Sequence, residues 1–385
     1  MTGRNPALDG IRGVAVLFVL MFHTTHMGHG SGVAEVIWRI SLALNCGVEI
    51  FFVLSGFLIT GILLEAKGTP DYFRNFYARR TLRIFPLYYA VVTLCALAPW
   101  ILPMSTAFPV PKLKYGGAPY WLYLSNVWSA GPHPVLGVAW SLAVEEQFYL
   151  LWPMVVFLLG ARALSGVCVF NILLGLGYRI AVSYGKLPWP TAAPVAYLDL
   201  LSLGALIALR FRPSDGAGAL RAAKIMAAAA ATFVVLIVAK NEGFWDRERY
   251  TIGVTAVGLF TGAAILAVSF PGGSPTVGRV FGTRLLRVFG KYSYAIYLIH
   301  SPLDAVVRRK IFRADASFAT LADHQLLAQV LYWILLAALS LGLAWLSWNL
   351  YEKHFINLKR FFPRRGEADG VEPNLSPTSP PPAVG

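Results

Sequence analysis

Residues 8–23 read LDGIRGVAVLFVLMFH and form the first long apolar segment of the chain. The segment carries two groups that are costly inside a lipid bilayer, the guanidinium of Arg12 and the imidazole of His23. Eleven residues are close to three helical turns, so both side chains share one helix face about 16 Å apart along the axis. The stretch predicts a membrane helix with a cation toward one surface and a proton acceptor toward the other.

The whole chain has the composition of an integral membrane protein. Of its 385 residues 57% are hydrophobic and 14% are charged, and the mean hydropathy is +0.59. These values lie outside the profile of soluble globular domains. Apolar stretches near the ~20 residues that cross hydrocarbon are 8–27, 43–64, 82–102, 140–159, 164–182, 194–209, 223–239, 251–270, 286–306 and 327–350. We expect an all-α polytopic membrane protein with about ten transmembrane helices.

The distribution of Lys and Arg predicts the orientation. Basic residues favour the cytoplasmic side of a membrane, and their excess here places both termini in the cytoplasm. The net charge of +14 then reflects topology together with an anionic-ligand site, and we expect no nucleic-acid partner. A composition rich in Ala, Gly, Arg and Pro indicates a GC-rich bacterial genome, so we expect a multi-pass protein of the bacterial cytoplasmic membrane, surrounded by lipids.

The domain organisation is simple. Residues 1–362 are predicted to form one membrane domain, and residues 363–385 a Pro-rich cytoplasmic tail that cannot bury a core and is disordered. The three cysteines, Cys46, Cys95 and Cys168, lie in or beside apolar segments without metal-ligand spacing, which indicates small buried side chains. The sequence does not indicate an oligomeric state.

A pair of arginines stands near the start of the predicted third helix. Arg80 and Arg83 are three residues apart and therefore neighbours on one helix face. Forked guanidinium groups suit phosphate, so the pair, with Arg12, predicts an anion site at the cytoplasmic ends of helices. The alternative is that these arginines only anchor the helices at the cytoplasmic surface.

Ionisable groups on the predicted outer side form a second set around His23. An imidazole can act as a base near neutral pH, and Glu49 and Glu145 are expected at similar depth, where a carboxylate could orient or charge-balance it. A structural histidine is the alternative.

A metal site is a further alternative for this region. His23, His26 and His29 stand at spacing three, but Gly28 and Gly30 indicate that the helix is ending there. Three ligands are therefore not expected to converge, and we expect no metal.

Small and aromatic residues complete the candidate site. Ser55 and Gly56 let a backbone or a thin ligand chain approach closely. Trp140, Ser141 and Tyr149 flank the acids of the 140–149 stretch. His300, in the predicted ninth helix, lies at a depth similar to that of His23. His300 and Asp304 form a His-x-x-x-Asp pattern, which by itself is weak evidence for acyl transfer.

Taken together, four motifs resemble acyltransferase family 3, the membrane O-acyltransferases that modify O-antigens, peptidoglycan, other exopolysaccharides and macrolide antibiotics. They are LDGIRGVA with His23, GVEIFFVLSGFLI at 47–59, RTLRIFP at 80–86 and WSLAVEEQFY at 140–149. The stretch SYAIYLIH at 293–300 and Glu352 resemble later signatures of the family. The likeness covers about residues 5–360.

The resemblance implies a ten-helix domain that uses cytoplasmic acyl-CoA as donor. It assigns Arg12, Arg80 and Arg83 to the CoA phosphates, while the pantetheine arm would pass Ser55 and Gly56. His23 would deprotonate an acceptor hydroxyl or carry the acyl group itself, and Glu145 or Glu49 would stabilise the imidazolium. Candidate substrate-binding residues are Trp140, Ser141, Tyr149 and His300.

The function expected from these observations is transfer of an acetyl or other short acyl group to a hydroxyl of an envelope glycan or glycosylated metabolite. A macrolide antibiotic is the alternative acceptor, with the same chemistry. A proton-coupled secondary transporter is the alternative of a different class, although no half-to-half internal repeat is evident. A third is a polytopic scaffold or receptor that binds no thiol cofactor.

Overall fold

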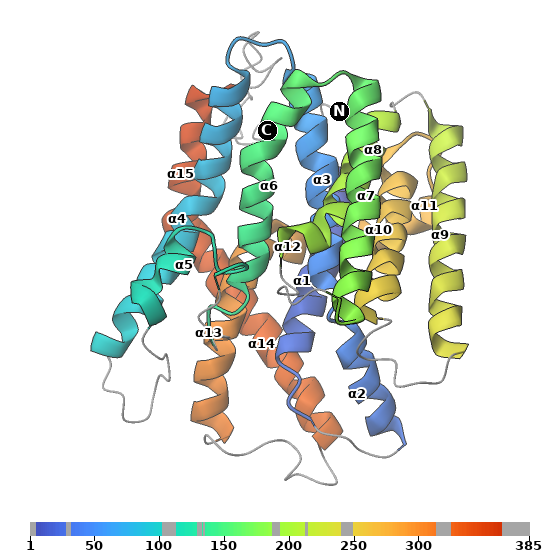
Figure 1. The fold of residues 1–385 in the computed structure, drawn as a ribbon. Helices are drawn as coiled ribbons and strands as arrows, with labels where there is room; N and C mark the ends of the chain where they lie inside the picture. The colour runs from blue at the N-terminus through green and yellow to red at the C-terminus, as the bar shows by residue number, and fades with distance from the viewer. Residues whose placement is uncertain are drawn as a thin grey trace, which may run out of the picture.

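The computed structural model describes residues 5–27, 32–101, 113–128, 133, 135–186, 193–211, 215–239, 249–312 and 325–363. Regular secondary structure within these ranges is entirely helical, and Figure 1 shows the long helices running side by side as a bundle. The α-helices are α1 Pro6–His23, α2 Val33–Ala43, α3 Gly47–Ala66, α4 Tyr72–Ile101, α5 Ala118–Trp121, α6 Ala139–Leu158, α7 Ala161–Ser183, α8 Leu198–Arg210, α9 Gly216–Ala239, α10 Val254–Ser269, α11 Pro275–Phe281, α12 Arg284–Lys291, α13 Ser293–Phe312, α14 Gln325–Ser347 and α15 Lys353–Asn357.

Eight helical stretches of the described residues are long and apolar enough to cross a membrane. The all-α membrane fold is thereby confirmed. The two remaining predicted segments are also helical but differ in form. The segment 194–209 contains α8, which has only 13 residues, and the segment 286–306 is divided at Tyr292 into α12 and α13. The predicted tail lies outside the described residues from 364 onward.

Helix α3 lies at the centre of the bundle and packs against α1, α6, α8 and α10. Its contact with α8 is a backbone-to-backbone approach, because a Cβ atom on Gly56 would lie 1.8 Å from the backbone oxygen of Leu201. Gly204 of α8 meets the Val53 backbone in the same way. Small residues at such crossings let membrane helices approach closely.

Glycines also let helix α1 pack closely against the backbone of α11 and α12. A Cβ atom on Gly13 would lie 2.0 Å from the backbone oxygen of Leu286, and one on Gly290 would lie 1.7 Å from that of Asp9. The glycines around Arg12 are therefore needed for packing. They place α1, with its two ionisable side chains, inside the bundle.

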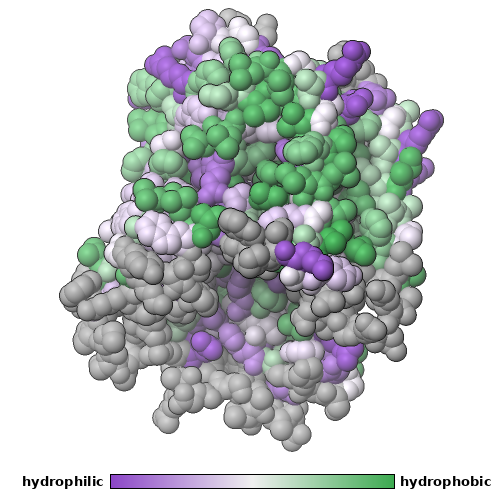
Figure 2. Space-filling model, in the orientation of Figure 1, coloured by the Kyte–Doolittle hydropathy of each residue, from purple (hydrophilic) through white to green (hydrophobic). Residues whose placement is uncertain are grey.

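Apolar side chains on the outer helices face outward. Leu173 of α7, Ile225 of α9 and Leu331 of α14 are exposed, and Figure 2 shows broad hydrophobic areas over the described part of the upper half of the molecule. In lipid such a surface carries no penalty, since hydrocarbon is as apolar as these side chains. The polar side chains of interest lie inward of it.

Candidate active site

A cluster of charged and hydroxyl side chains lies inside the bundle around Arg80 of α4. Its guanidinium stands 4.0 Å from Glu145 Oε2 and 3.9 Å from Glu146 Oε1. The same group lies 3.7 Å from the centre of the Tyr149 ring, and the Tyr149 hydroxyl hydrogen-bonds to that of Ser55. Helices α3, α4 and α6 are joined through this cluster.

The depth of this cluster differs from the expectation. Helix α4 begins at Tyr72, ten residues before the predicted segment, so Arg80 lies about 12 Å inside its helix rather than at the end. Glu145 stands about 9 Å into α6, which begins at Ala139. The prediction that Glu145 faces His23 is therefore corrected, because its carboxylate faces Arg80.

The other two predicted arginines lie within electrostatic range of Arg80 and of each other. Arg12 Nη1 is 3.3 Å from Asp9 Oδ1, one turn earlier on α1. Arg83 forms neither an ion pair nor a hydrogen bond with any residue that the structure describes, although it lies in the electrostatic field of Glu352. A half-buried guanidinium of this kind can bind an anion without first giving up a partner.

A cleft open to solvent lies beside this cluster, between α3, the first half of α4 and the chain near residue 360. Its apolar wall comes from Ile59, Ile62, Leu63, Ala66 and Phe76. Its basic lining is Arg79, Arg80, Arg83 and Lys359. A concave site with one apolar wall and several cations suits a ligand that joins an anionic group to a slender, less polar chain.

His23 is the last residue of α1, a helix that ends in the lower half of the view in Figure 1. Its Nδ1 lies 2.8 Å from the Val19 carbonyl oxygen. A carbonyl can only accept, so Nδ1 carries the proton of the neutral ring and Nε2 keeps a lone pair. The side chain is exposed. These features leave His23 able to take a proton from a bound group.

Two predicted substrate-binding residues lie near this imidazole. The ring centres of His23 and His300 of α13 are 5.2 Å apart. Tyr297, 5.9 Å from His300 between ring centres, shares a hydrogen bond with the hydroxyl of Ser141. The structure thus brings His300 and Ser141 to the region of His23.

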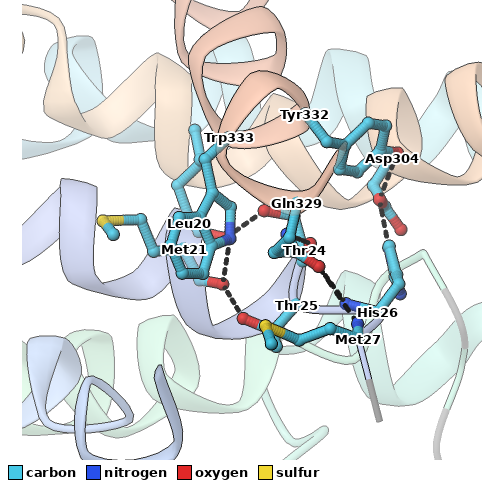
Figure 3. Close-up of polar contacts among 10 residues, drawn as sticks. All are labelled: Leu20, Met21, Thr24, Thr25, His26, Met27, Asp304, Gln329, Tyr332 and Trp333. Atoms are coloured by element: carbon cyan, nitrogen blue, oxygen red, sulfur yellow. Dashed lines mark hydrogen bonds and ion pairs between the residues drawn. The ribbon is translucent and has the colours of Figure 1, made fainter. Parts of the chain in front are cut away.

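Helix α14 fastens the chain just after His23 (Figure 3). Gln329 Oε1 accepts hydrogen bonds from the backbone N–H groups of His26 and Met27, at 2.7 and 3.1 Å. Its Nε2 donates to the Thr24 carbonyl at 2.9 Å. These backbone groups follow the end of a helix and have no intrahelical partners there. One amide side chain therefore holds the turn that carries the imidazole.

A second set of contacts surrounds this turn. His26 Nε2 lies 2.8 Å from Asp304 Oδ1 of α13, and the Tyr332 hydroxyl donates to the same oxygen at 2.7 Å. Trp333 Nε1 donates to the Met21 carbonyl at 3.1 Å. The end of α1 is thus fixed from two neighbouring helices.

The remaining predicted residues form no hydrogen bond, ion pair or ring contact with the His23 imidazole in the part of the chain that the structure describes. Glu49 is buried in the first turn of α3, within electrostatic range of Tyr197 and Tyr297. Trp140 stacks at a tilt on Tyr197, with ring centres 5.2 Å apart. Gly56 is corrected from ligand contact to helix packing, because the α8 backbone occupies the space beside it.

Sequence reasoning missed the contacts from α14. Gln329, Tyr332 and Trp333 stand three and four residues apart, which places them on one helix face, and Gln329 is fully buried. That polar stripe in an apolar helix is the signal that could have found them. The metal alternative included His29, which lies outside the described residues.

Comparison with known proteins identifies the family. The model of a family described as "Acyltransferase domain" matches residues 5–349. The peptidoglycan O-acetyltransferase OatA of Listeria monocytogenes is 30% identical over 331 residues, 77% of this chain and 49% of that protein. "Putative peptidoglycan O-acetyltransferase YrhL" of Bacillus subtilis is 29% identical over 329 residues, 77% of this chain and 48% of its own length. No solved structure matches the chain.

The match runs through the helical bundle from α1 to the end of α14. Residues 5–349 include α1 with Arg12 and His23, the arginines of α4 and the acids of α6. This chain spans about half the length of the curated relatives that it matches. The chain belongs to the acyltransferase domain family.

Proposed function

We propose that this protein is a membrane O-acyltransferase that moves an acetyl or other short acyl group from acyl-CoA to a hydroxyl of an envelope glycan. The family supports acyl transfer, and two relatives named as peptidoglycan O-acetyltransferases support a glycan acceptor. The proposal includes a place in the bacterial cytoplasmic membrane, with the donor entering from the cytoplasm.

The observation that carries the proposal is the cleft beside Arg83. CoA joins phosphate groups to a flexible pantetheine arm, and the cleft offers guanidinium groups next to an apolar wall. Arg83 has no carboxylate partner among the described residues, and Arg12 lies within its electrostatic range. From Arg12, helix α1 runs about 16 Å to His23, a span that the pantetheine arm would cover.

The chemistry at His23 follows from its tautomer. The acceptor hydroxyl gives its proton to Nε2 as its oxygen bonds to the thioester carbonyl carbon. The carbon–sulfur bond then breaks, and the departing thiolate takes the proton from the imidazolium. Nδ1–H stays on the Val19 carbonyl throughout and holds the ring plane. No proton is gained or lost overall.

Acyl transfer by the purified full chain in lipid nanodiscs tests this function. Labelled acetyl-CoA is supplied with a soluble peptidoglycan fragment, a macrolide or no acceptor, and products are identified by mass spectrometry. Label on the glycan hydroxyl supports the proposal. Label found only on the macrolide would show that the acceptor is a small lipophilic molecule and not a glycan. Absence of transfer to either acceptor would refute the proposed function.

A single-turnover reaction without acceptor separates a base from an acyl carrier. The base mechanism predicts that no acetyl group remains on the protein after rapid quenching. An acetyl group on His23 would show instead that the imidazole is a covalent carrier. Both outcomes are read from the mass of the peptide that contains residue 23.

A further inference from the structure

Helix α13 presents two ionisable side chains to the end of α1. His300 and Asp304 are one helical turn apart. His300 lies beside His23, with ring centres 5.2 Å apart, and Asp304 pairs with His26 (Figure 3). The two residues of the His-x-x-x-Asp pattern therefore lie on one face of α13. This face packs against the end of α1, where His23 is.

The hydrogen bonds of His300 define its neutral form. The residue is fully buried, and its Nδ1 lies 3.2 Å from the carbonyl oxygen of Ile296. Since the carbonyl must accept, the proton is on Nδ1 and Nε2 bears a lone pair. Nε2 forms no hydrogen bond within the part of the chain that the structure describes. Leaving a buried acceptor without a donor is costly.

A base that takes a proton in the transition state needs a group that stabilises the resulting cation. No carboxylate among the described residues forms an ion pair with His23. Glu145 faces Arg80. Asp304 lies within electrostatic range of His23, but its Oδ1 already accepts from His26 and Tyr332. His300 is the polar ring beside the His23 imidazole.

We propose that His300 is a positioning residue whose Nε2 lone pair faces the His23 ring and stabilises its imidazolium during acyl transfer. The inference rests on the proposed function. The lone pair would accept a hydrogen bond from Nε2–H of His23 while His23 holds the acceptor's proton. When that proton passes to the thiolate, the His23 ring returns to the neutral form seen here, and His300 stays neutral throughout. No proton leaves His300 itself.

Three replacements of His300 test this role in the purified full chain. His300→Gln keeps a polar group at the reach of Nε2, His300→Asn keeps one only at the reach of Nδ1, and His300→Phe keeps the ring without an acceptor. His354→Phe, at an exposed position on α15, controls for loss of a histidine. The readouts are kcat, KM for the acceptor and Kd for acyl-CoA.

We expect the Phe and Asn variants to lose kcat by about 100-fold, the lower end of what a proton-transfer group contributes. Kd for acyl-CoA should stay within about threefold, less than 1 kcal/mol. The Gln variant should recover about tenfold of the loss. If the Phe variant does not bind acyl-CoA, the Gln and Asn variants, which bury similar polar groups, decide the question.

Equal kcat for the Gln and Asn variants, or a Phe variant within about threefold of wild type, would overturn the inference. So would a parallel loss of kcat and of acyl-CoA binding in the Gln and Asn variants. These results differ from failure of the proposed function, in which the unaltered protein transfers no acyl group. An active His23→Ala protein would refute His23 as the base and, with it, the role given to His300, while leaving acyl transfer itself in place.

Discussion

Among the three arginines, the pairing of Arg83 best indicates that the cluster is a ligand site and not only a structural ion-pair network. Arg12 stands beside Asp9 and Arg80 beside two glutamates, so each partly compensates a carboxylate. Arg83 forms no such pair with a described residue and lines the cleft. Its positive field is therefore available to an anion.

Replacing Arg83 should weaken donor binding. We expect Arg83→Gln to raise Kd for acyl-CoA by about 10- to 100-fold, since hydrogen bonds to charged groups contribute about 1.5–3 kcal/mol. Arg83→Lys should recover part of the loss, because lysine restores the positive charge but not the forked hydrogen-bond donors of the guanidinium. Calorimetry with acetyl-CoA measures both.

Arg39→Gln is the matched control for this pair of variants. Arg39 is exposed on α2, where it pairs with Glu35, and its loss should leave donor affinity unchanged. Equal affinity of the Arg83→Gln protein and the control would exclude Arg83 from the donor site.

Arg80 has a different role, because it compensates buried acids. Arg80→Gln should lower the free energy of unfolding by about 3–5 kcal/mol, since removing one partner leaves the Glu145 and Glu146 carboxylates uncompensated. Thermal unfolding in detergent measures the effect. The double variant Arg80→Gln, Glu146→Gln should regain stability relative to the single variant; further loss would show that the Arg80–Glu146 contact is not stabilising.

The residue types of the site could be predicted from sequence, while their pairing could not. Ionisable groups in apolar segments revealed Arg12 and His23 because each is costly in lipid. The contact between Glu145 and Arg80 was not predicted, because α4 starts at Tyr72 and carries Arg80 about 12 Å into its helix. Residues 72–80 include charged and aromatic side chains that hydropathy excludes from a membrane segment, although they are helical.

At the scale of single elements, α14 determines how the end of α1 is held. Gln329→Leu should lower kcat by about tenfold or more, because loosening a reacting group by even 1 Å is costly. Kd for acyl-CoA should be unchanged, since the cleft lies at the other end of the site. A loss of donor affinity equal to the loss of kcat would show a general structural defect instead.

Helix α3 offers a packing test with an internal control. Gly56→Ala forces a Cβ atom against the α8 backbone, so we expect a destabilisation of about 1–3 kcal/mol. Gly61 lies on the same helix with nothing within 4 Å of its Cβ position. Gly61→Ala should therefore be neutral or slightly stabilising in thermal unfolding. Equal stability of the two proteins would contradict the close α3–α8 contact.

Periodicity alone could find the long helices but not the breaks within them. The predicted segment 286–306 merges α12 and α13, which are separate helices that meet at Tyr292. The predicted segment 327–350 ends within a π-helical turn, Trp348–Glu352, that continues α14. Such turns depend on tertiary contacts and have no local sequence signature. Here the turn packs against α4, and the ring of Trp348 meets that of Tyr292.

At the scale of the whole molecule, polar groups are concentrated inside an apolar shell. A cleft reaches the arginines from one end, and His23 is exposed near the other. Helix α1 connects the two regions because its glycines bring it close to α12. The fold thus separates the proposed donor site from the proposed base by most of one helix.

Acyl transfer by the His23→Ala protein tests the central claim most directly. The full chain in nanodiscs is assayed with labelled acetyl-CoA and the glycan acceptor, and donor binding is measured in parallel by calorimetry. We expect turnover to fall by at least about 100-fold, as for loss of a general base, while Kd for acetyl-CoA is unchanged. An unaltered rate of transfer by the His23→Ala protein would contradict the account.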